Sequence, residues 1–195
     1  MKHFRLSKPS YLMTWLAIGF LIRIHKFDDS IYERFSFRQT QTAFGIRSLS
    51  TESLNPLEAQ VPVLGTPWKI PFEFPLYQFL AALITRFFSL NESTSGRFLT
   101  TIFFLLAALF SFLILEKTHS ELVARTSTPL FILTSFSLQW ESAVLIDWQA
   151  VALTLFAIYL LILHESKKKF MSLNLVLALT IISLASLTKI TTTPP

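Results

Sequence analysis

Cysteine is absent from the sequence, glycine is scarce and charged residues are few. The 195 residues include no cysteine and four glycines, and only 15% of them are charged. Without cysteine the chain forms neither a disulfide framework nor a thiolate metal site. A soluble domain carries roughly 25% charged residues, so this chain has little surface suited to water. Hydrophobic residues make up 52% of it, including twenty phenylalanines, and this composition predicts an integral membrane protein.

Long hydrophobic stretches predict the membrane-spanning helices, each of which needs about 20 apolar residues. The five candidates lie at residues 10–27, 98–115, 129–146, 148–163 and 173–187. One more apolar stretch, 74–90, differs from these because it has a proline at its start and contains Arg86. Whether this stretch also crosses the membrane depends on the charges that flank the other spans.

The basic residues predict the orientation in the membrane. Lys2, Arg5 and Lys8 precede the first span, and three lysines at 167–169 follow the fourth. Such clusters favour the cytoplasmic side, and both lie there when four crossings separate them. A further crossing at 74–90 would put the second cluster outside. We therefore expect 74–90 to be an interfacial or re-entrant helix at the outer face, with a six-span arrangement as the alternative.

This topology places the N-terminus in the cytoplasm and makes residues 28–97 a long extracytoplasmic loop. Within the loop, residues 37–49 predict a short helix that ends near Ser50, and its mixed apolar and arginine composition suits a membrane interface. Prolines between residues 56 and 75 exclude a long regular element after it. The expected fold class is all-α: a polytopic transmembrane helical bundle whose long first outer loop carries interfacial helices.

The candidate catalytic groups are carboxylates on the outer side. Asp28, Asp29 and Glu33 form an acidic cluster after the first span, and Asp147 separates the third and fourth spans. Glu73 lies between two phenylalanines, where burial would raise its pKa. Each acid has an ordinary alternative, as a solvated loop residue, a turn residue or a helix cap. Facing one another, they would act as a base on an acceptor or bind a divalent metal ion.

The candidate binding groups are basic and amide side chains. Arg38, Gln39 and Gln41 form a dense hydrogen-bonding group in the run RQTQTA, and Lys189 follows the last span. A cation at this face would pair with a phosphate or diphosphate, whereas contact with lipid headgroups is the ordinary alternative for Arg38. The net charge of +5 does not predict nucleic-acid binding, because the basic residues are scattered or flank hydrophobic runs.

Two segments are similar to a known family. The run PFEFPLYQFLAALITRFFSLNESTSGRF has an acid and a proline, an apolar helix, a polar turn and an arginine, with Glu73, Pro75 and Arg97 at the matching positions. The run SLQWESAVLIDWQAVALTLFAIYLL has a second-loop acid, Asp147, followed by an apolar span. In these features and in the order of its spans, the chain resembles the GT-C glycosyltransferases, within the branch of protein O-mannosyltransferases and aminoarabinose transferases of lipid A.

The resemblance implies a glycosyltransferase of the bacterial inner (plasma) membrane. It would transfer a sugar from a polyprenyl-phosphate-linked donor to a lipid, glycan or protein acceptor at the extracytoplasmic face. Its catalytic candidates are Asp28, Asp29, Glu73 and Asp147. Its substrate-binding candidates are Arg38, Gln41, Arg97 and Lys189. A divalent metal ion is left open as a cofactor, with Glu73 and Asp147 as the ligands.

The chain departs from the family at one position that matters. Family members commonly carry an Asp-Glu pair in the first loop, and the comparable stretch here is Arg38-Gln39-Thr40-Gln41. Either the base has moved upstream to the acids at Asp28, Asp29 and Glu33, or Arg38 and Gln41 bind a phosphate or sugar instead.

Family members also continue with further spans beyond the region compared. We therefore expect residues 1–195 to be the N-terminal part of a longer enzyme, inactive on its own. The alternative hypothesis is a non-catalytic polytopic membrane protein, such as a transporter subunit or an assembly partner. A transporter would place ionisable residues deep within its spans, whereas here the polar groups gather at the outer edge.

Overall fold

The computed structural model describes residues 7–32, 35–60, 73–134, 143–166 and 172–189. All regular structure in these residues is helical, as the long hydrophobic stretches predicted, and comprises seven α-helices and one short 3-10 helix. Several features used above lie outside the described residues, namely Lys2, Arg5, Glu33, the lysines at 167–169 and residues 135–142 of the predicted third span.

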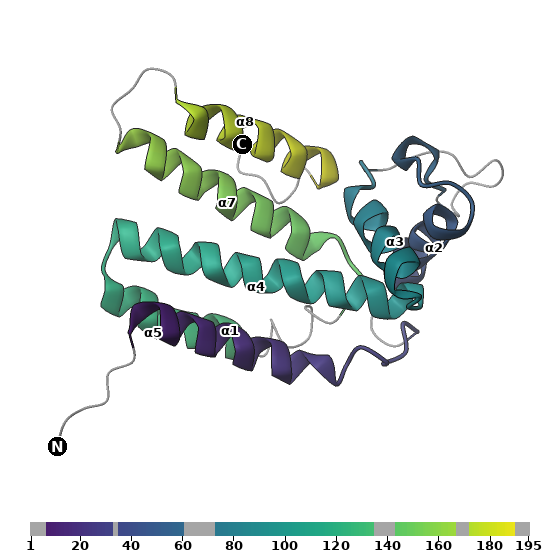
Figure 1. Cartoon of the computed structure of the whole chain (residues 1–195), viewed down its shortest axis with the longest axis horizontal. Coiled ribbons are helices and arrows are strands. Elements are labelled where there is room, and N and C mark those ends of the chain that lie inside the picture. Colours follow the sequence, from purple (N-terminus) through teal and green to yellow (C-terminus); the bar gives the residue numbers. More distant parts are fainter. Residues whose placement is uncertain (1–6, 33–34, 61–72, 135–142, 167–171, 190–195) are drawn as a thin grey trace.

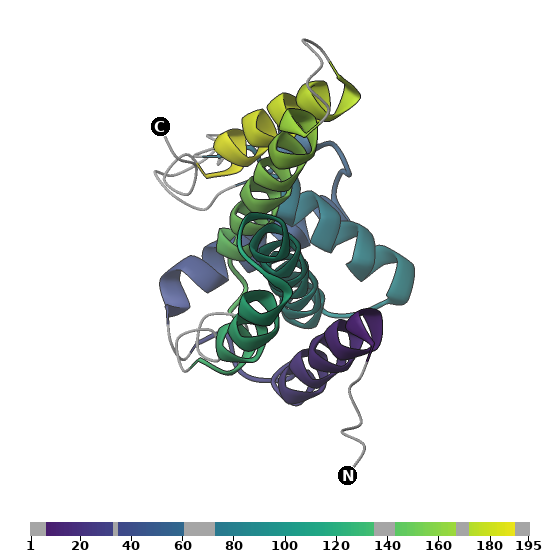
Figure 2. The same cartoon turned by 90° about the vertical axis from the view of Figure 1, so that its left-hand side faces the viewer.

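Five of these helices lie side by side along the long axis of the molecule (Figure 1). They are α1 (Lys8–Ile24), α4 (Glu92–Thr118), α5 (Glu121–Leu133), α7 (Asp147–Glu165) and α8 (Leu173–Thr188). The long helix α4 is central and packs against α1, α5 and α7, while α8 packs against α7. Viewed along the bundle, α1 and α8 lie on opposite sides of α4 and α7 (Figure 2).

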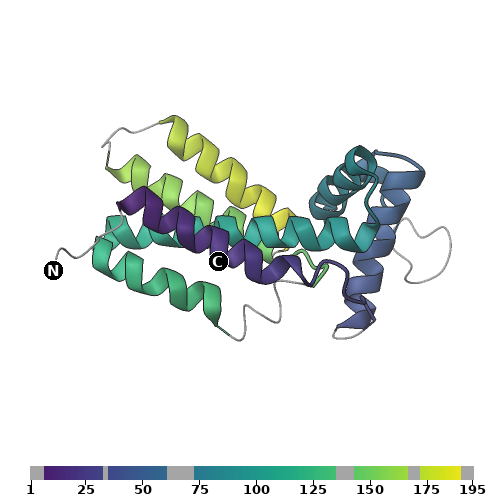
Figure 3. The ribbon, with the colours of Figure 1, turned by 60° about the horizontal axis from the view of Figure 1, so that its bottom comes forward.

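The remaining helices gather at one end of this bundle. They are α2 (Ser36–Thr51), the short helix η1 (Pro56–Glu58) and α3 (Leu76–Phe88). Helix α2 runs across the bundle end (Figure 3), and it packs against both α3 and α4. The helices predicted at 37–49 and 74–90 are therefore both present, with ends shifted by one or two residues. Their relation to a membrane stays a prediction.

Polar caps fix where most of the bundle helices begin. Ser7, Asn91, Ser120 and Ser172 each precede a helix and accept a hydrogen bond from a backbone N–H of its first turn, which such residues do well because those N–H groups have no partner within the helix. Ser89 ends α3 in the left-handed conformation, with φ 53°. The chain therefore changes direction within a few residues and enters α4 (Figure 1).

Two of the described helices, α4 and α7, are long and apolar enough to cross a membrane. They contain the predicted spans 98–115 and 148–163. Helices α3 and α8 are apolar but shorter. By length and composition, α4 and α7 are therefore the two described helices that support a membrane location.

The structure differs from the predicted helix at 129–146. Helix α5 begins earlier, at Glu121, because Ser120 caps it. It ends at Leu133, where Thr134 turns to extended backbone, and residues 143–146 are not helical. Hydropathy reports which residues are apolar, whereas helix ends depend on caps and on local backbone conformation.

The side chain of Phe104 in α4 joins the bundle helices at their centre. Its ring stacks on Phe131 of α5 at 5.4 Å and meets Trp148 of α7 edge-on at 4.8 Å. The guanidinium of Arg23 in α1 lies over the same ring, 4.1 Å from its centroid. Arg23 is fully buried and donates hydrogen bonds to the carbonyl oxygens of Gly19 and Ile132, so it ties α1 to α5.

Helix α5 contains Pro129, which has no N–H to donate to the carbonyl oxygen of Arg125 one turn earlier. The hydroxyl of Tyr11 in α1 donates to that oxygen instead, at 2.6 Å. The guanidinium of Arg125 also lies over the Tyr11 ring, 4.8 Å from its centroid. The carbonyl oxygen that Pro129 leaves without a helical partner thus attaches α5 to α1.

We expect Tyr11→Phe to lower the free energy of unfolding by about 1 kcal/mol, because it removes this hydrogen bond and keeps the ring. In a Pro129→Ala background the helix regains its own N–H donor, so the same substitution should have a smaller effect. Denaturation of the four proteins of this cycle in detergent measures both effects. An equal loss in the two backgrounds would show that the hydroxyl does not compensate for the proline.

Candidate active site

An ion pair joins the start of α7 to the end of α8. Asp147 is the first residue of α7, and Lys189 is the residue that ends α8. The Lys189 ammonium donates to Asp147 Oδ1. Each charge also suits its helix end, because a helix N-terminus favours an anion and a C-terminus a cation. Both side chains are mostly buried, at 28% exposed for Asp147 and 17% for Lys189.

The segment before α3 joins this pair through one backbone hydrogen bond. The Phe74 N–H donates to the carbonyl oxygen of Leu187 at 3.0 Å. That oxygen belongs to the last turn of α8, where carbonyl groups lack partners within the helix. The bond brings the neighbouring Glu73 close enough to Lys189 and Asp147 for both charges to act on its carboxyl group.

The surroundings of Glu73 raise its pKa above the usual value of 4.5. The largest cause is burial, which disfavours the charged form, and the negative charge of Asp147 adds to it. The positive charges of Arg38 and Lys189 and a hydrogen bond from the Gln78 side chain act in the opposite direction. The apolar setting between two phenylalanines predicted the direction of this shift.

Glu73 does not cap the helix that follows it. The residue at the cap position of α3 is Pro75, and no side chain there accepts a hydrogen bond from the helix. The capping alternative considered from the sequence is therefore excluded. Gln78, one turn into α3, is buried and bonds the Glu73 carboxyl group, so α3 holds the acid through a side chain that the sequence did not single out.

Helix α2 supplies the remaining candidate groups. Arg38 is exposed, and its charge is the strongest of those that act on Glu73. Gln41 is half-buried one turn further along α2. Between them, the buried Gln39 accepts a hydrogen bond from the Val144 N–H at 3.0 Å. Helix α2 is thereby attached to the segment that leads into Asp147.

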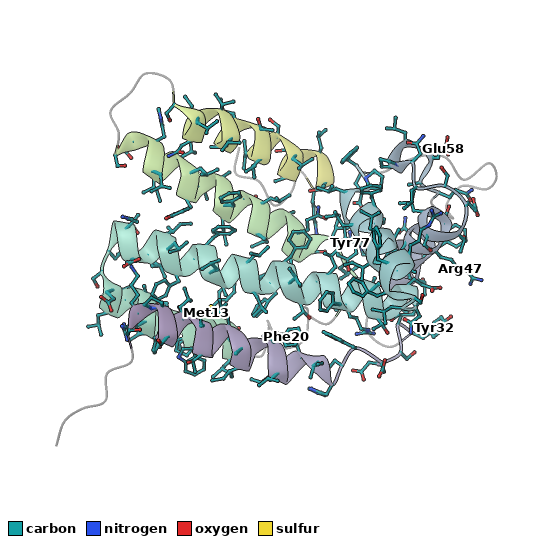
Figure 4. The ribbon with its side chains drawn as sticks, in the orientation of Figure 1. Met13, Phe20, Tyr32, Arg47, Glu58 and Tyr77 are labelled. Carbon is teal, nitrogen blue, oxygen red and sulfur yellow. The ribbon has the colours of Figure 1, made fainter. Side chains whose placement is uncertain are left out.

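A buried pair of hydroxyl groups, those of Tyr77 and Thr100, contacts the segment before Asp147. Tyr77 Oη is 2.7 Å from both the Gly96 carbonyl oxygen and Thr100 Oγ1, and Thr100 donates to the carbonyl oxygen of Ala143 at 3.0 Å. Burial raises the pKa of Tyr77, so its hydroxyl keeps its proton and remains a donor. Figure 4 shows Tyr77 where α3 meets the bundle.

The structure does not bring Asp28 and Asp29 to Glu73. Both are exposed and line a separate hollow of about 410 Å³, together with Asn91 and Glu92 at the start of α4. Among the described residues, neither is one of the charges that act on Glu73. The acids closest to the first span in sequence therefore lie apart from the cluster around Asp147.

Arg97 also has a different position from the other cationic candidates. It is buried in α4, and its Nη2 donates to the carbonyl oxygens of Asp29 and Ser30 at 3.0 and 3.1 Å. These bonds hold the chain that leaves α1 against the start of α4. This contact could not be predicted from the sequence, because 67 or more residues separate its partners along the chain.

No protein-family model, curated protein or solved structure matches the chain. Five residues meet at this end of the bundle, and we call them the Glu73–Asp147 cluster: Arg38, Glu73, Gln78, Asp147 and Lys189. It combines an acid whose pKa is raised, an acid neutralised by an ammonium group, and a second cation. Such a set can accept a proton and can bind an anion.

Glu73 is expected to titrate above pH 4.5 in the folded protein, and Arg38→Gln should raise the midpoint further because it removes a charge that favours the carboxylate. Carbon-13 NMR of carboxyl-labelled glutamate in detergent measures the midpoint, with Glu73→Gln assigning the signal. Arg47→Gln is the matched control, since Arg47 is exposed on the same helix and does not act on Glu73. An ordinary midpoint, or equal shifts in both variants, would contradict the assignment.

Proposed function

We propose that the chain is part of a polytopic membrane glycosyltransferase of GT-C type. It would use a polyprenyl-phosphate-linked sugar and act at the extracytoplasmic face of the bacterial inner membrane. The single observation that carries the proposal is the Glu73–Asp147 cluster, in which a proton-accepting acid and two cations meet at one end of an apolar helical bundle. The resemblance to GT-C glycosyltransferases assigns Glu73 and Asp147 to the same site.

The surface of the bundle supports a membrane location. Large apolar side chains on several bundle helices point away from the core, among them Met13, Leu21, Leu130, Leu173 and Leu179, each more than half exposed. Exposed apolar side chains on three of the bundle helices suit contact with lipid tails. In the proposed topology the N-terminus is cytoplasmic, and the end of the bundle covered by α2 and α3 faces outward.

In the proposed reaction Glu73 is the base. An acceptor hydroxyl oxygen forms a bond to the anomeric carbon of the sugar while its proton passes to the Glu73 carboxylate. The bond between that carbon and the phosphate oxygen breaks, and its electron pair leaves with the polyprenyl phosphate. Arg38 and Lys189 stabilise the negative charge of the departing phosphate. A raised pKa suits this role, because a base works best when its pKa is near the working pH.

The donor set fits an anionic phosphate better than a divalent metal ion. Lys189 already neutralises Asp147, and Arg38 places a second positive charge near Glu73. Cations repel a metal ion and attract a phosphate. No step of the proposed reaction therefore passes through a metal.

The other candidates have supporting roles in this proposal. Gln41, one turn from Arg38, would contact the sugar or phosphate. Arg97 would act indirectly by holding the chain after α1, and Asp28 and Asp29 would have no part in the reaction, because they lie apart from the cluster. The partners are a lipid-linked sugar and membrane lipid, and no nucleic acid is involved.

The alternative is a non-catalytic polytopic protein, such as a transporter subunit or an assembly partner. One observation favours it: Arg23 is a fully buried cation within α1, and transporters place ionisable residues within their spans. However, the Arg23 guanidinium bonds two backbone carbonyl groups and packs on Phe104, which accounts for it as part of the bundle. A non-catalytic protein would tolerate loss of the Glu73 carboxylate.

Glu73→Gln in the full-length protein should lower sugar transfer by at least about 100-fold, because it removes the base. Asp147→Asn should lower it about 10-fold or more by displacing Lys189. Transfer of radiolabelled sugar from an undecaprenyl-phosphate donor in membranes measures both. Glu58→Gln removes an exposed acid at the same end of the molecule (Figure 4) and should have no effect. If both site variants retain full transfer activity, the proposed enzyme site is wrong and the non-catalytic alternative remains.

The orientation can be tested independently, because a chain without cysteine allows single cysteines to be introduced cleanly. Thr51→Cys at the end of α2 should react with a membrane-impermeant maleimide in intact cells. His119→Cys between α4 and α5 should react only after the cells are opened. Both positions are exposed, so labelling of both in opened cells is the control. The reverse pattern would refute the proposed topology.

A further inference from the structure

Two side chains hold the segment at residues 143–144 from opposite sides. Gln39 of α2 accepts a hydrogen bond from the Val144 N–H, and Thr100 of α4 donates to the Ala143 carbonyl oxygen, both at 3.0 Å. Gln39 is 4% exposed and Thr100 is fully buried. Because this segment is not helical, its buried backbone groups need such partners.

A short turn connects this attached segment to Asp147. The Leu145 N–H donates to the Ala143 carbonyl oxygen at 2.9 Å, and the Ala150 N–H donates to the Ile146 carbonyl oxygen as α7 begins. The backbone between Val144 and Asp147 is therefore a tight turn followed directly by helix. A displacement of Val144 would move Asp147.

The side chain of Val144 is fixed as well, because it packs on the bare backbone of Gly96. A Cβ atom at Gly96 would lie 2.5 Å from Val144 Cγ1, much closer than two carbon atoms approach. Val144 is fully buried at this contact. Helix α4 therefore sets the position of Val144 from one side, and Gln39 sets it from the other.

Gln39 also adjoins Arg38 in α2, and the Arg38 charge acts on Glu73. One turn of α2 thus carries both the guanidinium near one acid and the amide that holds the segment before the other acid. The spacing between the two halves of the Glu73–Asp147 cluster depends on this turn.

We propose that Gln39 is a positioning residue of the Glu73–Asp147 cluster. It sets the distance between the Arg38–Glu73 half and the Asp147–Lys189 half, and so the spacing between the acceptor hydroxyl and the phosphate. This inference rests on the proposed function. Gln39 touches neither substrate nor reacting atoms. Small misplacements of reacting groups, near 1 Å, lower rates by about 100-fold.

The test compares Gln39→Met, which keeps the length of the side chain but has no acceptor oxygen, with Gln39→Glu, which keeps one. Gly96→Ala displaces Val144 from the opposite side and serves if Gln39→Met fails to accumulate. Gln39→Met and Gly96→Ala should lower kcat by about 10–100-fold with little change in KM, and should move the titration midpoint of Glu73. Gln39→Glu should retain most of the kcat of the unchanged protein.

Tyr11→Phe is the matched control, because it also removes a hydrogen bond to a backbone group but in the α1–α5 contact. It should lower stability without moving the Glu73 midpoint or the ratio of kcat to KM. The inference is overturned if Gln39→Met behaves like Tyr11→Phe, or if Gln39→Glu is no better than Gln39→Met. Failure of the proposed function looks different: transfer would survive Glu73→Gln while the Gln39 variants still move the midpoint, and that result supports the positioning alone.

Discussion

Buried backbone N–H and carbonyl groups need hydrogen-bond partners, and in apolar surroundings water does not provide them. Within a helix the requirement is met locally. It becomes demanding where the helical pattern breaks, and the structure meets it there with contacts between distant parts of the chain. The Tyr11 hydroxyl bonds the carbonyl group that Pro129 leaves free. Gln39 and Thr100 bond the turn at residues 143–144.

The same requirement assembles the Glu73–Asp147 cluster. The bond from the Phe74 N–H to the Leu187 carbonyl oxygen satisfies the end of α8 and places Glu73 beside Lys189. Asp147 and Lys189 lie at helix ends whose dipoles suit their charges. Backbone groups at helix ends lack partners within the helix and need polar partners from elsewhere. The acids and cations at this end of the bundle therefore lie close to such helix ends.

Much of the helical structure could be predicted because its causes are local. The apolar stretch at 74–90 predicted α3, and the mixed run at 37–49 predicted α2. Both predictions succeeded because apolar content and turn residues influence the backbone over only a few positions. The helix predicted at 129–146 differed, because the Ser120 cap starts α5 early and the chain is extended at Thr134. The raised pKa of Glu73 was predictable for the same local reason: apolar neighbours flank it in the sequence.

The sequence by itself determined that the chain is helical and apolar, and that its polar groups gather in the segments between the apolar stretches. Only the tertiary structure decided which of those groups meet. Glu73 joins Asp147 and Lys189 through a bond between residues 74 and 187, while Asp28 and Asp29 line a separate hollow. Composition and local pattern fix helices, but proximity between distant segments depends on packing and on which side chains satisfy which backbone groups.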